Sequence, residues 1–407
     1  RDDVREPLLD TLWQRAILAE QAGRDELMVQ DQIERIKLYD HTGEHMARWN
    51  APAQLQVTSD PPGAKLTLRR YRQENGRLRI DLAEELGTTP LPARTLERGS
   101  YILHFELPGK VLVGYPVALG RGESFTVTVT LPPADAVPNG FIYVPPGRFL
   151  YGSRDIESVR TFLRAEPMHL VETGAYLIAR DEVTYDGYLE FLAAQSPTDR
   201  ATLLAASASG PMQLELRPEG NWRLTLTFPT NSHTVDSGVP IVYPGRTQRA
   251  SVAWERLPLT GITDLEANAY MAWLDRTGKV PGARYCNEYE WERAARGADG
   301  RLFVSGDEFH PEDGNFDETY GKVPTAMGPD AVGSYPQNAS PLGLHDTDGN
   351  AYELTVGTTD KTLMVRGGAY FYSKIQARTT ARFEFPAGYR DPTLGLRVCA
   401  TWPPHTD

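Results

Sequence analysis

The spacing of hydrophobic residues changes from a helical to an alternating period at about residue 50, and this change limits the folds open to the chain. Residues 1–50 place leucine or isoleucine near helical spacing, as at Leu8, Leu12 and Ile33, with a break around Gly23. Residues 51–133 instead hold short alternating runs separated by glycine and proline turns. The sequence therefore predicts a helical segment followed by a small β-sandwich.

A proline-containing linker at 132–138 ends the sandwich, and we expect a third domain over residues 139–402. A chain of 407 residues with 40% hydrophobic content can bury two or three packed cores. Because it begins at Arg1 without a methionine or a secretory signal, we interpret it as a fragment or a processed form. The expected class is therefore α+β with three parts.

Charge and hydropathy exclude several classes of partner. The formal net charge is −12, whereas nucleic-acid or anionic-membrane binding calls for a basic surface. No apolar run reaches the roughly 18 residues that span a bilayer. We expect neither nucleic-acid binding nor a transmembrane span within this chain.

An acidic loop at 346–353 is the strongest candidate for a metal site. It places Asp346, Asp348, Asn350 and Glu353 around one glycine, and such oxygen-rich segments suit calcium. The spacing does not match an EF-hand, because the glycine comes fourth and no glutamate stands twelfth. The alternative is a polar turn whose side chains bond their own backbone.

The two cysteines, Cys286 and Cys399, stand far apart, and neither lies in a CxxC pattern or a Cys/His cluster. This excludes a thiolate zinc site and a disulfide-rich scaffold. We predict two buried thiols, since unpaired cysteine is among the most buried residue types. A single long-range bridge is the alternative.

Motifs along residues 141–397 resemble those of the sulfatase-modifying-factor family, which includes the formylglycine-generating enzymes and has a C-type-lectin-like fold. They lie, in order, at 141–152, 166–171, 182–191, 258–262, 272–274, 284–297, 332–336, 343–344, 349–350, 366–368 and 395–397. The turns at 59–64, 99–101 and 108–109 make the preceding sandwich similar to the PEGA family, a non-enzymatic β module. Residues 195–250 depart from the family pattern as an insertion, in which runs at 213–216, 222–228 and 241–243 predict a small extra sheet.

The resemblance implies calcium ligands in the acidic loop. The matching positions are Asp346, Gly349, Ala351 and Glu353, with carbonyl oxygens serving at the middle two. A second calcium site of the enzymes begins at an asparagine that matches Asn315. We therefore expect calcium as the cofactor.

The resemblance also locates reactive residues that this chain lacks. The enzymes bind copper through paired cysteines after the Arg-Gly-Gly strand, where this chain has Tyr372 and then Gln376 or Ala377. The iron-dependent sulfoxide synthase branch needs a histidine triad, but the histidines beyond residue 50 are isolated. Copper chemistry is therefore not expected.

An aromatic and basic surface occupies the expected active groove. Its candidate ligand-binding residues are Tyr370, Tyr372, Arg378, Arg382, Tyr389 and Arg390. Tyrosine and arginine are enriched where proteins recognise partners. The alternative is that Arg378 and Arg382 form structural salt bridges with Glu384, Asp391 or the acids of the Glu288-Glu290-Glu292 helix.

The order of helical segment, sandwich and third domain resembles the C-terminal sensor half of certain bacterial serine/threonine protein kinases, although the chain lacks kinase motifs. We therefore predict a non-catalytic, calcium-stabilised module that binds a protein or small ligand. An extracytoplasmic location in the cell envelope is expected slightly ahead of a cytoplasmic one. The alternatives are a formylglycine-generating-type oxidase with displaced chemistry and a structural envelope scaffold.

Overall fold

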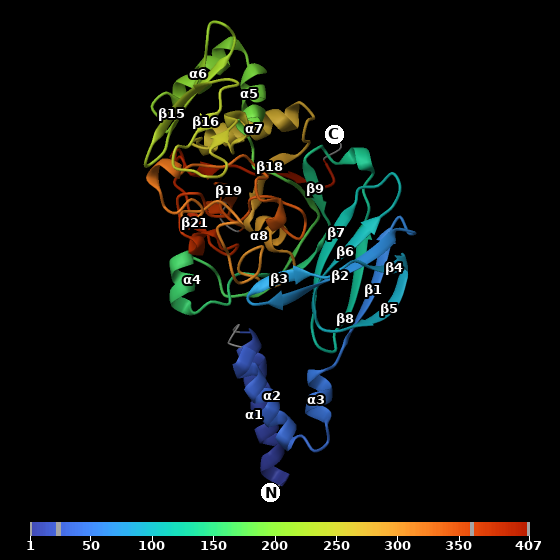
Figure 1. The fold of residues 1–407 in the computed structure, drawn as a ribbon. Coiled ribbons are helices and arrows are strands. Elements are labelled where there is room, and N and C mark those ends of the chain that lie inside the picture. The colour runs from blue at the N-terminus through green and yellow to red at the C-terminus, as the bar shows by residue number, and fades with distance from the viewer. Residues whose placement is uncertain (1, 22–25, 359–361, 405–407) are drawn as a thin grey trace.

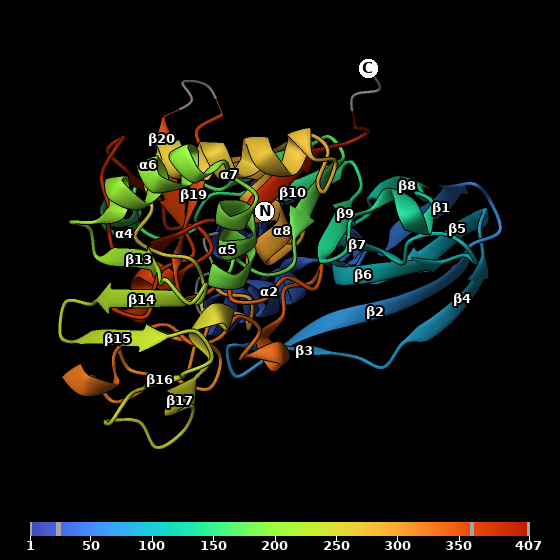
Figure 2. The same ribbon diagram turned by 90° about the horizontal axis from the view of Figure 1, so that it is seen from above.

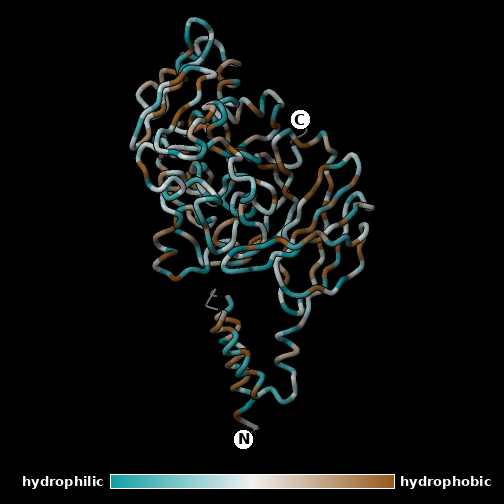
Figure 3. Tube along the Cα trace, in the orientation of Figure 1, coloured by the Kyte–Doolittle hydropathy of each residue, from teal (hydrophilic) through white to brown (hydrophobic). Residues whose placement is uncertain are grey.

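The computed structural model describes residues 2–21, 26–358 and 362–404. A pair of helices projects from the rest of the molecule, which holds the sheets (Figure 1). Hydrophobic residues recur along the helices and along the strands (Figure 3). None of the helices within these ranges is long and apolar enough to cross a membrane.

The N-terminal helices lie where the hydrophobic spacing predicts them. They are α1 (Asp2–Gln21), α2 (Glu26–Tyr39) and the short α3 (Glu44–Trp49). The predicted break around Gly23 lies outside the described residues. These helices bury a core of their own, formed by Leu9, Leu12, Ala16, Ile33, Ile36 and Trp49. The Glu20 carboxylate accepts hydrogen bonds from both terminal nitrogens of Arg121, at 2.6 and 2.8 Å, which ties α1 to the next part of the chain.

Two sheets make up that next part. One has the order β5 (Leu91–Leu96), β1 (Ala53–Asp60) and β8 (Ser124–Thr130), with β1 and β8 parallel. The other has the order β3 (Arg77–Ile80), β2 (Lys65–Glu74), β6 (Gly99–Glu106) and β7 (Val113–Leu119), and β4 (Glu84–Thr88) also pairs with β2. Alternate residues such as Leu55, Leu66 and Leu103 are buried, as the period of two predicts.

Polar contacts fix these two sheets against the third part of the chain, residues 139–402, which we call the body. Both terminal nitrogens of Arg77 donate to the buried Asp313 carboxylate, at 2.8 and 2.6 Å. The Ser100 hydroxyl donates to Asp299 at 2.6 Å. Bidentate arginine–carboxylate contacts define an orientation as well as adding attraction, so the two parts are held in one arrangement.

The body is built on one mixed sheet. Its order is β21 (Phe383–Glu384), β20 (Leu363–Arg366), β19 (Tyr352–Val356), β18 (Ala283–Asn287), β23 (Val398–Thr401), β12 (Tyr176–Ala179) and β9 (Phe141–Val144), and β22 (Leu394–Gly395) pairs with β19. A separate antiparallel pair is formed by β10 (Gly147–Tyr151) and β11 (His169–Thr173). The central strands therefore come from distant parts of the sequence.

Helices and short 3-10 turns surround this sheet. The helices are α4 (Glu157–Leu163), α5 (Tyr185–Ala193), α7 (Asp264–Arg276) and α8 (Glu288–Arg296). The 3-10 turns are η1 (Ala134–Ala136), η2 (Trp254–Arg256), η3 (Pro324–Ala326), η4 (Pro336–Asn338) and η5 (Lys374–Ala377). A capping box of Asn287 and Glu290 starts α8 directly after β18, which places this buried helix against the sheet.

The insertion forms its own small sheet on the side of the body opposite the sandwich (Figure 2). It comprises α6 (Pro197–Ser207) and the antiparallel sheet β13 (Met212–Leu216), β14 (Trp222–Thr227) and β15 (Ser232–Asp236). The expected third run at 241–243 pairs elsewhere, because β16 (Ile241–Val242) joins β17 (Ser251–Val252). A tight turn after β14, in which the Phe228 N–H donates to the Asn231 carbonyl, returns the chain early enough for β15 to take that place.

Candidate functional site

The acidic loop leads into β19 at the centre of the body sheet. Glu353 on that strand is fully buried, and both of its carboxylate oxygens are bonded. Arg397 donates to Oε1 at 2.5 Å and to Oε2 at 2.8 Å, and Trp291 Nε1 donates to Oε2 at 2.5 Å. Because a charge buried this deeply requires compensation, Arg397 serves as the cation for Glu353.

Asp346, at the start of the same loop, forms no ion pair with a lysine, arginine or histidine of the described residues, and the charges of Arg397 and His345 offset its burial only in part. Its Oδ2 accepts a hydrogen bond from the Gly333 N–H at 2.6 Å, and burial raises the pKa of Asp346 to about 6. The fully buried Glu182 accepts from Asn350 Nδ2 at 3.3 Å through Oε1, whereas its Oε2 has no hydrogen-bond partner. Burial and the charge of Asp346 raise the pKa of Glu182 well above its usual range. Two buried carboxylates with so little compensation favour a cation nearby.

The expected calcium site therefore fits the Asp346 loop in part. Asp346 supplies an oxygen ligand without a cation, and Gly349 and Ala351 follow it in a tight turn whose backbone carbonyls are the other expected ligands. Glu353 fits less well, because both of its oxygens are already bonded. Within the described ranges, no group of three or more histidine, cysteine, aspartate or glutamate side chains is placed to hold a metal. A calcium ion at this loop would therefore depend on backbone oxygens.

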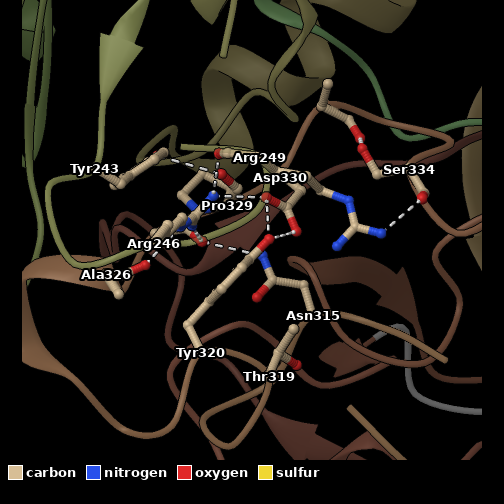
Figure 4. A network of polar contacts seen from close by, with 12 residues as sticks. Tyr243, Arg246, Arg249, Asn315, Thr319, Tyr320, Ala326, Pro329, Asp330 and Ser334 are labelled. Carbon is tan, nitrogen blue, oxygen red and sulfur yellow. Dashed lines mark hydrogen bonds and ion pairs between the residues drawn. The ribbon is translucent and has the colours of Figure 1, made fainter. Parts of the chain in front are cut away.

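A buried arginine from the insertion lies beside the second expected metal position (Figure 4). Arg246 donates to Asp330 Oδ1 at 2.6 Å, to the Gly328 carbonyl at 2.6 Å and to the Ala326 carbonyl at 2.7 Å. Both side chains of the Arg246–Asp330 pair are fully buried. The guanidinium carbon also lies 3.6 Å from the centre of the Tyr243 ring. This guanidinium is thus a cation enclosed by a carboxylate, carbonyls and an aromatic ring.

Asn315 belongs to the same network. Its Nδ2 donates to the Gly328 carbonyl at 3.0 Å and to Asn350 Oδ1 at 3.3 Å. The Gly328 carbonyl, which accepts from this amide, also accepts from Arg246, and Arg246 pairs with the nearby Asp330 carboxylate in the same network. The residues around Asn315 therefore do not fit a metal ion, and we do not propose one there.

The two cysteines form a disulfide, so the prediction of buried thiols is wrong. Cys286 on β18 and Cys399 on β23 have an S–S distance of 2.10 Å, and both are fully buried. Pairing of these antiparallel strands brings their Cα atoms to 4.8 Å. The two cysteines are 113 residues apart in sequence, so no local pattern indicates that they lie close together. Neither sulfur is a thiolate ligand in this structure.

A pocket of about 230 Å³ opens where the resemblance places the first reactive cysteine. Its apolar lining consists of Tyr352, Val365, Tyr372, Phe383, Phe385 and Leu394, and its polar lining of Gln376, Glu384, Asp391 and Thr393. The Tyr352 and Tyr372 ring centres lie 5.2 Å apart. Burial raises the pKa of Tyr372 above its usual range, so its hydroxyl is neutral at physiological pH.

The three arginines expected on the ligand-binding surface do not line this pocket. Arg378 pairs with Asp155 at 2.6 Å, and Arg390 pairs with Glu266 at 2.7 Å. Arg382 bridges two acids, Glu166 at 2.9 Å and Glu288 at 2.5 Å. The alternative of structural salt bridges holds for Arg382, which pairs with the expected Glu288. Arg378 also forms a salt bridge, but with Asp155 instead of the expected acids.

The three expected tyrosines are also placed differently from one another. Tyr372 lines the pocket, and Tyr389 lies at the surface with its ring centre 5.6 Å from that of Phe385. Tyr370 is buried against Phe228 of the insertion, at 5.5 Å between ring centres. The structure thus brings together Tyr372 and, through Phe385, Tyr389.

Sequence reasoning did not select Tyr352, Glu182 or Arg246 as site residues. Tyr352 lies within the acidic segment 346–353, next to Glu353, so strand alternation could have indicated that the two side chains face opposite sides of a strand. Glu182 is the first residue of the family-like motif at 182–191, and the motif alone does not indicate that its side chain is buried. No local signal connects Arg246 to Asp330, because 84 residues separate them.

Comparisons with known proteins agree with the motif pattern. The family model of the sulfatase-modifying factor enzyme 1-like domain matches residues 128–402. Similar solved structures include PvdO from Pseudomonas aeruginosa, with 20% identity and a TM-score of 0.44 over 64% of this chain and 93% of that one. Treponema denticola variable protein 1 has 15% identity and a TM-score of 0.41 over 64% and 94%, and CarF has 17% and 0.40 over 64% and 97%. No curated protein matches the chain.

The buried pair at Arg246 provides a direct test of the network. We expect Arg246→Met to lower the free energy of unfolding by about 3–5 kcal/mol, because Asp330 would stay buried without its cation. Chemical denaturation followed by circular dichroism measures the change.

Arg249→Met is the matched control. Arg249 donates to the Tyr335 hydroxyl and the Ser334 carbonyl at 3.3 and 3.4 Å, but it forms no ion pair with a carboxylate of the described residues. Adding Asp330→Asn to Arg246→Met should recover part of the loss, since it removes the unpaired charge. Equal free energies of unfolding for Arg246→Met and Arg249→Met would contradict the conclusion that Arg246 compensates the buried charge of Asp330.

Proposed function

The chain belongs to the sulfatase-modifying factor enzyme 1-like family over residues 128–402, and from this premise we propose that it is a non-catalytic binding module of that family. The placement of its sulfurs and of Tyr372 carries the proposal. Cys286 and Cys399 are bonded to each other inside the sheet, whereas Tyr372 lines the pocket at the position that resembles the first reactive cysteine of the enzymes.

The groups at the pocket do not provide the chemistry of the oxidases. Copper-dependent oxidation of a substrate cysteine requires soft thiolate ligands. The neutral Tyr372 hydroxyl is neither a thiolate nor a base. Gln376 and Ala377, at the second position, offer an amide and a methyl group. These substitutions leave a cavity whose lining holds no cysteine or other soft metal ligand.

The same pocket has the composition of a binding site. Mostly apolar walls with a few polar groups are typical of ligand pockets, and aromatic residues are enriched at protein interfaces. A volume of about 230 Å³ suits a single side chain or a small head group. We therefore propose that the ligand is a small molecule or one side chain of a protein partner.

Calcium is the proposed stabilising ion of this module. Asp346 and the carbonyl oxygens of Gly349 and Ala351 would hold it, with Glu353 in contact if Arg397 shares its oxygens. When bound, calcium would supply the positive charge that the buried Asp346 carboxylate lacks. The ion would stiffen the loop before β19, whose first residue, Tyr352, lines the pocket.

We further propose that the module is the sensor part of a bacterial serine/threonine protein kinase and acts outside the cytoplasm. The order of helices, PEGA-like sandwich and family domain supports the first part. The Cys286–Cys399 disulfide supports the second, because disulfides persist mainly in oxidising compartments. A structural envelope scaffold is the competing function, and it would need no ligand at Tyr372.

Catalysis is tested with copper(I), oxygen and a cysteine-containing sulfatase-motif peptide. We expect no aldehyde above the rate of the peptide alone, either before or after reduction of the disulfide. The measurement is mass spectrometry of the peptide, with a formylglycine-generating enzyme as the positive control. Aldehyde production that disappears in Cys286→Ser or Cys399→Ser would overturn the non-catalytic proposal.

Calcium binding is tested by thermal unfolding with excess chelator and with added calcium. We expect the melting temperature to rise by several degrees with calcium, because ligands that bind only the folded state stabilise it. Asp346→Asn should abolish the shift, while Asp317→Asn, an exchange of an aspartate that pairs with Lys322, should keep it. An unchanged melting temperature in wild-type protein would remove calcium from the proposal.

The sensor and compartment proposals are tested on the gene and in cells. The complete reading frame should encode a kinase domain and a membrane span upstream of this chain, and a frame without them would contradict the sensor role. In host cells quenched with acid, both cysteines should resist alkylation until a reductant is added. Thiols that alkylate without reduction would contradict an extracytoplasmic location.

A further inference from the structure

Four aromatic rings wall the pocket at Tyr372. They belong to Tyr352, Tyr372, Phe383 and Phe385, and they come from three separate parts of the body. Tyr352 is a fixed member, because it is buried and its hydroxyl donates to Gln376 Oε1 at 3.1 Å. Its ring centre lies 6.2 Å from that of Phe383 and 5.2 Å from that of Tyr372. The faces of aromatic rings are electron-rich, so four rings around one small volume favour a cation there.

A carboxylate without a cation completes the lining. Asp391 Oδ1 accepts hydrogen bonds from the Thr393 N–H at 2.8 Å and from the Thr393 hydroxyl at 2.5 Å. No lysine, arginine or histidine within the described ranges forms an ion pair with Asp391, although its neighbour Arg390 pairs with Glu266. The threonine bonds hold the carboxylate in place and leave its negative charge uncompensated.

The other acid of the lining, Glu384, does not change the negative charge of the pocket. Glu384 pairs with Arg164 at 3.1 Å, and both side chains are more than half exposed, so solvent screens that pair. The pocket lining contains no basic residue. The pocket is therefore aromatic and negative.

We propose that this pocket binds an organic cation, a quaternary ammonium head group or the charged end of a lysine or arginine side chain. The proposal rests on the proposed function and specifies its ligand. Cations are attracted to the faces of aromatic rings, and the attraction increases when the site is desolvated and a carboxylate is near. An anion is disfavoured at Asp391, and a bare metal ion finds too few oxygen ligands among rings.

The size of the pocket agrees with that class of ligand. Its volume of about 230 Å³ is below the roughly 300–1,000 Å³ typical of sites that enclose a drug-sized molecule. A trimethylammonium group or the end of a basic side chain fits this volume, with the rest of the ligand outside. Free choline-like molecules and basic peptides share this chemistry, so the experiment must separate the two sources.

The charge is tested with probes of equal shape. Choline and its uncharged isostere 3,3-dimethylbutan-1-ol are titrated into the 407-residue chain and followed by ligand-observed NMR. Nα-acetyl-lysine methylamide and the corresponding arginine and norleucine compounds form the peptide arm. We expect each cation to bind about tenfold more tightly than its neutral counterpart. The tighter arm identifies the source of the ligand.

Two variants locate the binding. Asp391→Asn keeps an acceptor for Thr393 and removes the charge, so it should weaken cation binding about tenfold and leave the neutral probes unchanged. Phe385→Leu keeps an apolar wall and removes a ring, so it should also weaken the cations selectively. Asp81→Asn is the matched control in the sandwich, where Asp81 pairs with Arg72, and it should bind like wild type. Thermal melts verify that each variant is folded.

The outcomes separate this inference from the proposed function. Equal binding of charged and neutral probes, lost in Tyr372→Ala but kept in Asp391→Asn, would overturn the cation preference and leave a binding module. Absence of saturable binding by every probe would also overturn it. Cysteine-dependent aldehyde formation in the copper assay would instead end the non-catalytic proposal, whatever the probes do.

Discussion

Buried arginine–carboxylate pairs are the constraint on which the family domain depends. Arg397 with Glu353, and Arg366 with Glu288 and Glu292, have side chains no more than 2% exposed. Removing either partner of such a pair leaves a charge in a medium that cannot solvate it, so the pairs must be complete in the folded state. The Arg366 pairs connect α8 to β20, and the Arg397 pair connects β19 to the segment before β23. These elements frame the acidic loop and the aromatic pocket. The position of the pocket follows from this charged frame.

The insertion extends the same principle. Arg246 brings a cation to Asp330, where the family resemblance suggested a second metal near Asn315. Together with the Cys286–Cys399 disulfide, it converts groups that could hold ions into fixed internal contacts. The pocket of rings and acids at Tyr372 lies beside this frame and is one of several pockets on the molecule.

The local parts of this structure could be predicted, and the long-range parts could not. The helices up to Trp49 and the alternating strands of the sandwich follow from periodicity, because burial of one face imposes the same period on sequence and structure. The third strand of the insertion was misassigned, since a turn after Phe228 decided the pairing. The arginines Arg378 and Arg382 were ambiguous in sequence, because a surface guanidinium and a paired one look alike until their partners are known.

The sequence by itself determined the family pattern of residues 128–402, the acidic loop at Asp346 and the presence of Tyr372 where the resemblance places a reactive cysteine. These are local statements, carried by residue types at short spacing. The tertiary structure alone decided that Cys286 and Cys399 are bonded, that Arg246 neutralises Asp330, and that Asp391 stands without a cation beside four rings. Each of these depends on strands or loops far apart in sequence meeting in space, and the free energy of a buried charge is set by what surrounds it there.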